Sequence, residues 1–248
     1  MGGSYRRAIV ETVHHYSGVR PEAAAIDTLK AEGCWNNDWD ASLELLRRNG
    51  LVEPPAYAAL VDVFNGFYFG GDPNGDPNNW QGFIGSEPLL VERCFFEALS
   101  EAGIAWGFVS GAEPPSARFV LEQRLGLHNP PLIAMGDAPD KPDPTGFLRL
   151  AAELSGGLGA GSLPVAYLGD TVADVLTVQR ARQQQSEQAF LSLAVAPPHL
   201  QAPEAAERRS QYEAQLLEAG ADAVIPCTTA VLTALEQALD GQSSAPTH

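Results

Sequence analysis

Residues 165–174 read Val-Ala-Tyr-Leu-Gly-Asp-Thr-Val-Ala-Asp, and the rest of the chain is organised around them. An apolar run short enough for a buried strand ends at Gly169, Asp170 follows at once, and Asp174 comes four residues later where the chain should be helical. Two carboxylates therefore meet at one strand end. Ligands bind at the carboxyl ends of parallel strands, and paired oxygens there suit Mg²⁺, which takes one or two carboxylates and then substrate phosphate. The alternative makes Asp170 a turn former or helix cap and Asp174 a solvated helix residue.

The composition limits the classes of function. The chain has 248 residues, enough for one large domain or two small ones, and 45% of them are hydrophobic. The net charge of −16 argues against nucleic acid as a partner, because basic surfaces bind phosphate backbones. No apolar run is as long as a membrane span and no basic and apolar leader opens the chain, so we expect a cytoplasmic protein with no membrane partner. The three cysteines are widely spaced and favour neither a disulfide framework nor a zinc site.

The pattern of apolar residues changes near residue 84. Before it, apolar side chains recur at helical spacing, and we expect a helical domain at 1–84. After it, an amphipathic helix is expected at 89–102, and further helices separate five predicted strands, at 104–109, 132–135, 165–169, 191–195 and 222–225. Strands separated by helices of this length form a parallel sheet covered on both faces. The prediction is an α/β fold with a Rossmann-like core at 85–248.

Three polar residues fall in one expected pocket. Ser110 ends one predicted strand and Asp170 ends another. Lys141 lies in Asp-Lys-Pro-Asp-Pro at 140–144, where prolines hold an extended approach to a helix. Lys141 is one of only two lysines in a chain whose other basic side chains are mainly arginines. The choice of the compact lysine ammonium at this position therefore suggests a role in the pocket. A surface lysine before a proline-rich loop is the alternative.

These segments, in this order and spacing, resemble the second, third and fourth motifs of the haloacid dehalogenase superfamily. They are Phe-Val-Ser-Gly at 108–111, Lys-Pro-Asp-Pro at 141–144 and Gly-Asp-Thr-Val-Ala-Asp at 169–174, and residues 220–225 resemble the last strand of that fold. The helical first third is similar to the mobile cap that phosphatase-like members insert after their first motif. The resemblance covers nearly the whole chain.

The resemblance implies a role for each matching residue. Ser110, with Gly111 beside it, would bind the phosphoryl oxygens. Lys141 would neutralise charge on the nucleophile and the phosphoryl group, and Asp170 with Asp174 would hold Mg²⁺. The implied enzyme is a Mg²⁺-dependent phosphatase of a small phosphorylated metabolite. A dehalogenase is less favoured, because carbon–halogen displacement does not require a metal.

Asn37 is a further candidate for substrate binding. It lies in Cys-Trp-Asn-Asn-Asp-Trp-Asp at 34–40, where the two Trp rings would form walls around a polar ligand and Asn36 or Asp38 could share the contact. The alternative is that Asn37 or Asp38 caps the following helix and that the rings are buried.

One part of the family pattern is missing. The first motif, an apolar strand followed by D-x-D-G, supplies the nucleophilic aspartate, and nothing similar precedes Ser4. Residues 62–66 are the best internal match, but they lack the second acid and lie in a helical stretch. We therefore expect the first core strand to be absent from these residues and the chain to be inactive or nearly so. Either the natural start lies upstream by a strand and a turn, or the chain is a non-catalytic module that binds a phosphorylated ligand or a protein.

Overall fold

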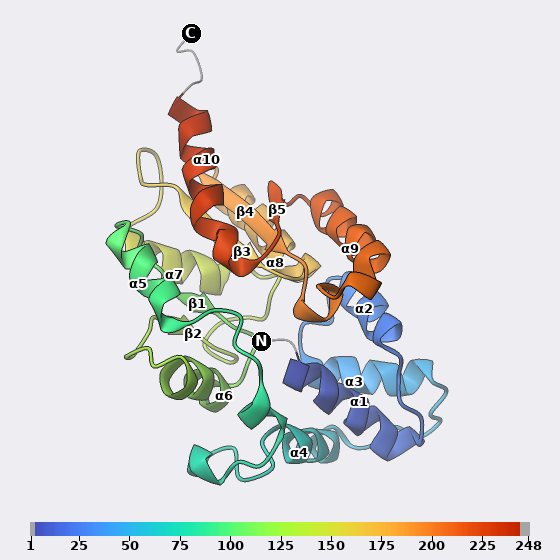
Figure 1. Cartoon of the computed structure of the whole chain (residues 1–248). Helices are drawn as coiled ribbons and strands as arrows, with labels where there is room; N and C mark the ends of the chain where they lie inside the picture. The colour runs from blue at the N-terminus through green and yellow to red at the C-terminus, as the bar shows by residue number, and fades with distance from the viewer. Residues whose placement is uncertain (1–2, 244–248) are drawn as a thin grey trace.

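Apolar residues at helical spacing make the first part of the chain a group of packed helices. The computed structural model describes residues 3–243, and its first four α-helices are α1 (Gly3–Ser17), α2 (Ala23–Ala31), α3 (Asp38–Arg48) and α4 (Tyr57–Tyr68). They lie together on one side of the molecule (Figure 1) and share a core that continues to Ile84. Among the described residues, only Phe119 and Val120 join this core from beyond Ile84. The division into domains 1–84 and 85–248 stays a proposal.

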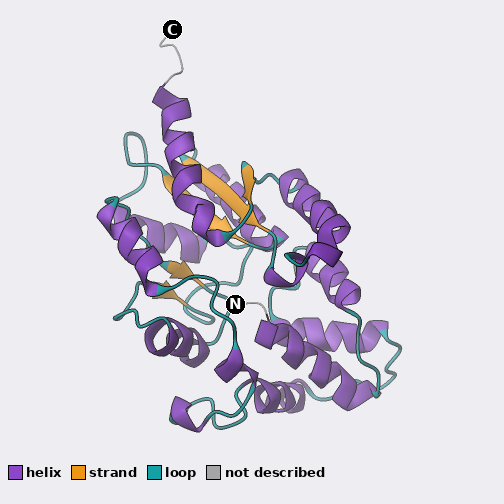
Figure 2. Cartoon of the chain, in the orientation of Figure 1, coloured by secondary structure: helices purple, strands orange, loops and turns teal. Residues whose placement is uncertain are grey.

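The rest of the chain alternates between helices and short parallel strands, as Figure 2 shows. Its elements are α5 (Arg93–Glu101), β1 (Phe108–Val109), α6 (Pro114–Arg118), a π-helix (Phe119–Arg124), β2 (Leu132–Ile133), α7 (Thr145–Ser155), β3 (Val165–Gly169), α8 (Val172–Gln184), β4 (Phe190–Val195), α9 (Ala206–Glu218), β5 (Ala223–Ile225) and α10 (Val231–Ser243). Helical connections let each strand return in the same direction, which gives parallel pairs. The predicted α/β fold is confirmed. Short 3₁₀ turns occur at Pro77–Asn79, Phe83–Ser86, Pro198–Leu200, Pro203–Ala205 and Thr228–Ala230.

The described strands form two separate sheets. β1 pairs with β2, while β3, β4 and β5 pair in that order. Two hydrophobic clusters nevertheless join the sheets, one containing Phe108 and Leu168 and the other containing Val109 and Tyr167. Because neighbouring side chains of a strand point to opposite faces, these clusters cover the two faces of the region between the sheets. The sequence predicted one parallel sheet; the strands are parallel, but the described ones pair in two sheets.

Four elements are shorter than the sequence predicted, among them β2, expected at 132–135, and β5, expected at 222–225. The helix expected at 89–102 begins only at Arg93, after a turn in which Leu90 is exposed. The strand expected at 104–109 is reduced to Phe108–Val109, partly because the Ile104 amide donates a hydrogen bond to the Leu99 carbonyl and so completes the end of α5. Backbone groups used in this way are not available to a strand.

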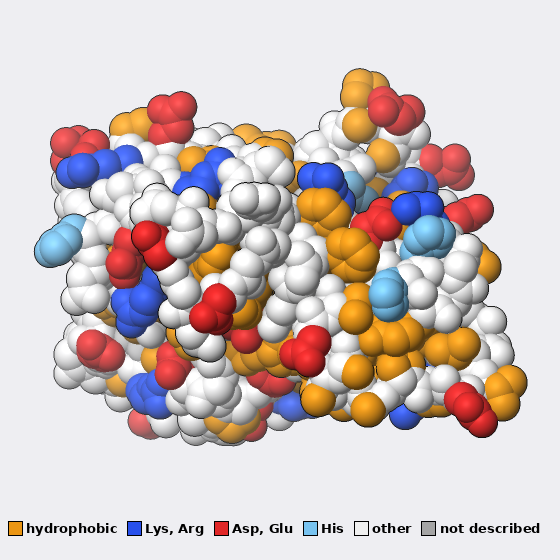
Figure 3. Space-filling model, turned by 90° about the horizontal axis from the view of Figure 1, so that it is seen from below, with side chains coloured by type: hydrophobic (Ala, Val, Ile, Leu, Met, Phe, Trp, Pro, Cys, Tyr) orange, Lys and Arg blue, Asp and Glu red, His pale blue; other side chains and the backbone are white. Residues whose placement is uncertain are grey.

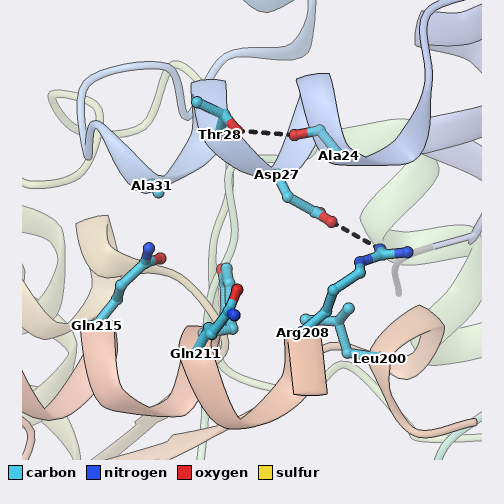
Figure 4. Close-up of a pocket in the computed structure, with 9 residues that line it drawn as sticks. Ala24, Asp27, Thr28, Ala31, Leu200, Arg208, Gln211 and Gln215 are labelled. Atoms are coloured by element: carbon cyan, nitrogen blue, oxygen red, sulfur yellow. Dashed lines mark hydrogen bonds and ion pairs between the residues drawn. The ribbon is translucent and has the colours of Figure 1, made fainter. Parts of the chain in front are cut away.

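Asp27 of α2 connects the N-terminal helices to the α/β core. Its carboxylate accepts hydrogen bonds from Arg6 (2.7 Å), from Arg208 of α9 (3.0 Å) and from His199 (2.8 Å). Figure 4 shows Asp27 and Arg208 pointing toward each other across a groove of about 150 Å³ between α2 and α9. Burial raises the pKa of Asp27, but the hydrogen bond from His199 and the charge of Arg6 outweigh it and leave the pKa below its ordinary value. Asp27 is therefore a charged contact between the two parts of the chain.

The surface reflects the acidic composition of the chain. On the face drawn in Figure 3, acidic side chains are scattered among polar ones, and hydrophobic side chains gather toward the side of the N-terminal helices. Within residues 3–243 no helix has the length and apolar character that crossing a membrane requires.

We predict that Asp27→Asn lowers the free energy of unfolding by about 1–3 kcal/mol at pH 7, because it weakens three charge-assisted hydrogen bonds. A carboxyl with a lowered folded pKa stabilises the protein above its unfolded pKa, about 3.9, and this contribution is lost as the pH falls through the folded pKa. The difference between wild type and variant should therefore shrink at pH 3. Urea unfolding at both pH values measures it, with the exposed Asp62→Asn as control. Equal effects of the two substitutions would contradict the prediction.

Candidate active site

A capping box places Asp174 directly behind the end of β3. Thr171 is the N-cap of α8 with extended backbone angles, and its hydroxyl accepts a hydrogen bond from the Asp174 amide. The Asp174 carboxylate in turn accepts from the Thr171 amide at 3.0 Å. This reciprocal pairing satisfies amides that a helix start would otherwise leave without partners. The carboxylate consequently folds back over Gly169, where an added Cβ would lie 2.3 Å from the Asp174 Cβ.

Lys141 reaches Asp174 from the loop after β2. Its Nζ lies 2.5 Å from Asp174 Oδ1, and the Tyr167 hydroxyl donates to the same oxygen at 3.0 Å. The exposed fractions of the Lys141 and Asp174 side chains are only 14% and 5%, so this is a buried ion pair. The structure therefore brings together two residues that lie 33 positions apart in the sequence.

The pair keeps both groups charged. Burial lowers the pKa of Lys141, but the charge and hydrogen bond of Asp174 outweigh it, and the pKa lies well above the ordinary lysine value. Burial likewise raises the pKa of Asp174, but the charge and hydrogen bond of Lys141 bring that pKa below its ordinary value. Burial raises the pKa of Tyr167, which stays protonated and donates its hydrogen bond.

Both oxygens of Asp174 are already used. Oδ1 accepts from Lys141 and Tyr167, while Oδ2 accepts from the Thr171 hydroxyl and from the amides of Thr171 and Asp170. A carboxylate with this many donors is positioned to orient Lys141 and to cap α8. These contacts favour a structural role for Asp174, and its expected role as a metal ligand stays a prediction.

Asp170 has the opposite environment. Within residues 3–243 its carboxylate has no hydrogen bond or ion pair with another side chain, although its backbone carbonyl accepts a hydrogen bond from Tyr212 at 2.9 Å. Burial first, and then the charge of Asp174, raise the pKa of Asp170. A half-buried carboxylate of this kind is a suitable Mg²⁺ ligand, because the cation would compensate its charge. The described residues contain no cluster of three His, Cys, Asp or Glu side chains for a metal, so other ligands would be backbone oxygens, water or substrate.

Ser110 and Gly111 lie at the end of β1 and therefore belong to the other sheet. The Ser110 amide donates to Ile133 at 2.8 Å, and the Ser110 hydroxyl accepts from the Ala112 amide at 3.1 Å. No hydrogen bond within the described part of the chain joins Ser110 to Lys141. The Asn36 amide group lies close over Gly111, 2.8 Å from the point that a Cβ there would occupy. The N-terminal helices thus place a polar side chain beside the phosphoryl-binding candidate.

Asn37 caps a helix, as the alternative interpretation of the sequence had it. Its side-chain oxygen accepts from the amides of Trp39 and Asp40, at 2.9 and 3.3 Å, at the start of α3. Asp38 is paired with Lys30 at 2.6 Å. The role of Asn37 in substrate binding stays a prediction, and Asn36 is the neighbour that lies beside Gly111.

Sequence reasoning missed two side chains of the site. Tyr167 stands in an apolar strand, where an aromatic residue is usually a core residue, and its hydroxyl contact with Asp174 depends on the fold. Thr171 was recognisable, because Thr-x-x-Asp before a helix is a capping pattern.

The comparison with protein families agrees with this geometry. Residues 91–182, which include β1, β2, β3 and most of α8, match the model of the haloacid dehalogenase-like hydrolases. The matched residues make up less than half of the chain, and over them the chain is similar to the haloacid dehalogenase-like hydrolases. The match covers Ser110, Lys141, Asp170 and Asp174, and it leaves the N-terminal helices outside.

Solved structures show the haloacid dehalogenase-like fold over most of the chain. A phosphonoacetaldehyde hydrolase-like protein from Oleispira antarctica is 15% identical with a TM-score of 0.67, and the match covers 99% of this chain and 89% of that one. Phosphatase Tt82 from Thermococcus thioreducens is 21% identical with a TM-score of 0.54, over 75% and 85% of the two chains. A predicted phosphoglycolate phosphatase from Haemophilus somnus 129PT is 13% identical with a TM-score of 0.56, over 94% and 90%. No curated protein sequence matches the chain. At these identities the structures show the fold alone.

We predict that Lys141→Met lowers the free energy of unfolding by about 3–5 kcal/mol at pH 7, because it leaves the charge of Asp174 buried without its cation. Since the pKa of Asp174 is lowered in the folded protein, the contribution of Asp174 is present above pH about 3.9 and is lost as the pH falls further. The effect of Lys141→Met should therefore be smaller at pH 3 than at pH 7.

The matched control is Lys30→Met, which removes the other lysine and its more exposed partner contact with Asp38. We expect this control to cost less than Lys141→Met, because the Asp38 side chain is 21% exposed whereas that of Asp174 is 5% exposed. Urea unfolding of both variants at the two pH values makes the comparison. Equal losses in the two variants, or a loss in Lys141→Met that does not depend on pH, would contradict the account of the pair.

Proposed function

We propose that the chain is a Mg²⁺-dependent phosphatase-type hydrolase that acts on a small phosphorylated metabolite. The observation that carries this proposal is the ion pair of Lys141 with Asp174 beside the unpaired carboxylate of Asp170. Phosphoryl transfer needs positioning and neutralisation of charge on the phosphoryl oxygens more than elaborate bond chemistry. A buried lysine and a carboxylate that fits a metal supply both at one strand end.

Each residue has its own task in this proposal. Lys141 has three N–H donors, and Asp174 fixes the ammonium in place so that the remaining donors serve the phosphoryl oxygens. Ser110 would add a hydroxyl donor from the end of β1. Asp170 would hold Mg²⁺, which when bound supplies positive charge to the phosphoryl group.

The N-terminal helices would act as the cap of the site. Asn36 supports this part of the proposal, because it is a side chain of the helical layer that lies against Gly111. A cap that closes over a substrate excludes water and adds contacts that select it. Asn36 is therefore the first residue of this layer that we expect to contact the substrate.

The names of the solved relatives agree with a phosphorus-containing substrate. One is called a phosphatase, one a predicted phosphoglycolate phosphatase and one a phosphonoacetaldehyde hydrolase-like protein. Their low identity to this chain gives no indication of which compound it takes.

A non-catalytic binding module is the second candidate. The observation that favours it is that, within residues 3–243, Asp170 is the one acid directly after a strand, so no second strand-end carboxylate is present to act as the nucleophile. Such a module would bind phosphate with Mg²⁺ and would not turn a phosphate ester over.

The test combines binding of inorganic phosphate with hydrolysis of p-nitrophenyl phosphate. We predict that calorimetry detects phosphate binding in the presence of Mg²⁺ and that Asp170→Asn weakens this binding by at least about tenfold, equivalent to about 1.4 kcal/mol. Ser110→Ala should weaken phosphate binding as well while leaving the thermal unfolding unchanged. Asp62→Asn and Ser86→Ala are the matched controls on exposed positions.

The outcomes separate the two candidates. Hydrolysis that requires Mg²⁺ and Asp170 supports the enzyme, whereas Mg²⁺-dependent phosphate binding without hydrolysis supports the binding module. Phosphate binding that does not respond to Mg²⁺, or that Asp170→Asn leaves unchanged, contradicts the proposed site in both forms.

A further inference from the structure

We propose that Tyr212 is a positioning residue of the candidate site: its hydroxyl fixes the backbone of Asp170 and so orients the carboxylate that would hold Mg²⁺. The inference rests on the proposed function, because it concerns the residue to which that proposal gives the metal. It goes further by assigning a role to a side chain of α9, which lies 42 positions along the chain from Asp170 and outside the residues that match the family model.

The Tyr212 hydroxyl is a polar group in an otherwise apolar cluster. Tyr212 and Leu216 are the buried residues of α9, and Tyr212 is only 6% exposed. The other members of the cluster come from α8, β4, α9 and the turns beside them, and all are Val, Ala or Leu. A buried hydroxyl costs free energy unless it has a hydrogen-bond partner, so packing alone would favour phenylalanine at this position. The hydroxyl therefore needs a reason other than packing.

The partner of this hydroxyl is the backbone carbonyl of Asp170. The two oxygens are 2.9 Å apart, and since a carbonyl oxygen can only accept, the hydroxyl donates. Asp170 directly follows the last residue of β3 and precedes Thr171, the N-cap of α8. Within residues 3–243 the Asp170 carbonyl accepts from the Tyr212 hydroxyl and from no backbone amide. Tyr212 thus holds a carbonyl that neither the sheet nor α8 holds.

Two contacts hold the peptide unit between Asp170 and Thr171. Tyr212 holds its carbonyl, while its amide, that of Thr171, donates to Asp174 Oδ2 at 3.0 Å. The amide of the preceding unit, that of Asp170, donates to the same oxygen at 3.2 Å. The peptide units before and after the Asp170 Cα are therefore both fixed, and with them the direction of the Cα–Cβ bond. Loss of a partner that orients a metal ligand typically lowers metal affinity by about 10–100-fold.

α9 is also attached to the N-terminal helices, one turn before Tyr212. Arg208 donates to Asp27 of α2 at 3.0 Å, and Figure 4 shows these two side chains pointing toward each other across the groove that Tyr212 helps to line. An effect of Tyr212 on Asp170 can therefore come from the hydroxyl or from the docking of the whole helix. Arg208→Met separates the two causes, because it breaks the contact with Asp27 and keeps the hydroxyl.

The experiment compares Tyr212→Phe with Tyr16→Phe. Both substitutions remove a hydroxyl that donates to a backbone carbonyl at 2.9 Å, and Tyr16 donates to Ala59 within the N-terminal helices. The probe is inorganic phosphate, whose affinity calorimetry measures with and without Mg²⁺ on folded protein. We predict that Tyr212→Phe reduces the gain in phosphate affinity from Mg²⁺ by about tenfold or more and changes the affinity without Mg²⁺ by less than about twofold. Tyr16→Phe and Arg208→Met should leave both affinities nearly unchanged, as would a hydroxyl that only stabilises the fold.

Hydrogen exchange gives a second readout that needs neither metal nor phosphate. The Thr171 amide belongs to the peptide unit whose carbonyl Tyr212 holds, so its exchange should become at least about fivefold faster in Tyr212→Phe. The Val178 amide in the middle of α8 is the internal control, because a general loss of stability would speed up both amides. Tyr16→Phe should leave the exchange of Thr171 unchanged.

The outcomes separate this inference from the proposed function. An equal gain from Mg²⁺ in Tyr212→Phe and wild type, or unchanged exchange of the Thr171 amide, would overturn the inference and leave the proposed function standing. An equal loss of the gain in Arg208→Met would assign the effect to the docking of α9 and would also overturn it. A wild-type chain whose phosphate affinity does not respond to Mg²⁺ would overturn both proposals.

Discussion

The buried ion pair of Lys141 with Asp174 is the interaction on which the candidate site depends. It links the loop after β2 to the start of α8, and so it holds together two sheets that have no strand pairing with each other. The same pair determines which of the two carboxylates is free to bind a metal. Since Asp174 uses its oxygens for Lys141, Tyr167 and the start of α8, Asp170 is left as the unpaired carboxylate.

The separation of the strands into two sheets also determines the geometry of the candidate site. Ser110 follows a strand of one sheet and Asp170 a strand of the other, so the spacing of the two sheets sets the distance between the proposed hydrogen-bond donor to the phosphoryl group and the proposed metal ligand. A ligand that needs both residues therefore depends on the spacing of the sheets. The ion pair and the hydrophobic clusters maintain this spacing within the described residues.

The sequence predicted the α/β core and the two acids at a strand end because apolar periodicity and the Gly-Asp turn are local signals. It did not predict the length of β1, since strand length depends on pairing and not only on the residues of the strand. The division of roles between Asp170 and Asp174 also escaped it, because the contact with Lys141 spans 33 positions. The contacts of Asp27 could not be predicted for the same reason. Its hydrogen bonds with His199 and Arg208 span more than 170 positions, and no local pattern indicates such a contact.

The most direct test of this account is a carboxyl NMR titration of Asp170 and Asp174 in the intact chain, with and without Mg²⁺. The account predicts that Asp174 titrates below the ordinary aspartate pKa of about 3.9 and Asp170 above it, and that Mg²⁺ lowers the pKa of Asp170 while leaving that of Asp174 nearly unchanged. Asp174 titrating above Asp170, or a response to Mg²⁺ at Asp174 alone, would contradict the assignment of Asp174 to Lys141 and of Asp170 to the metal.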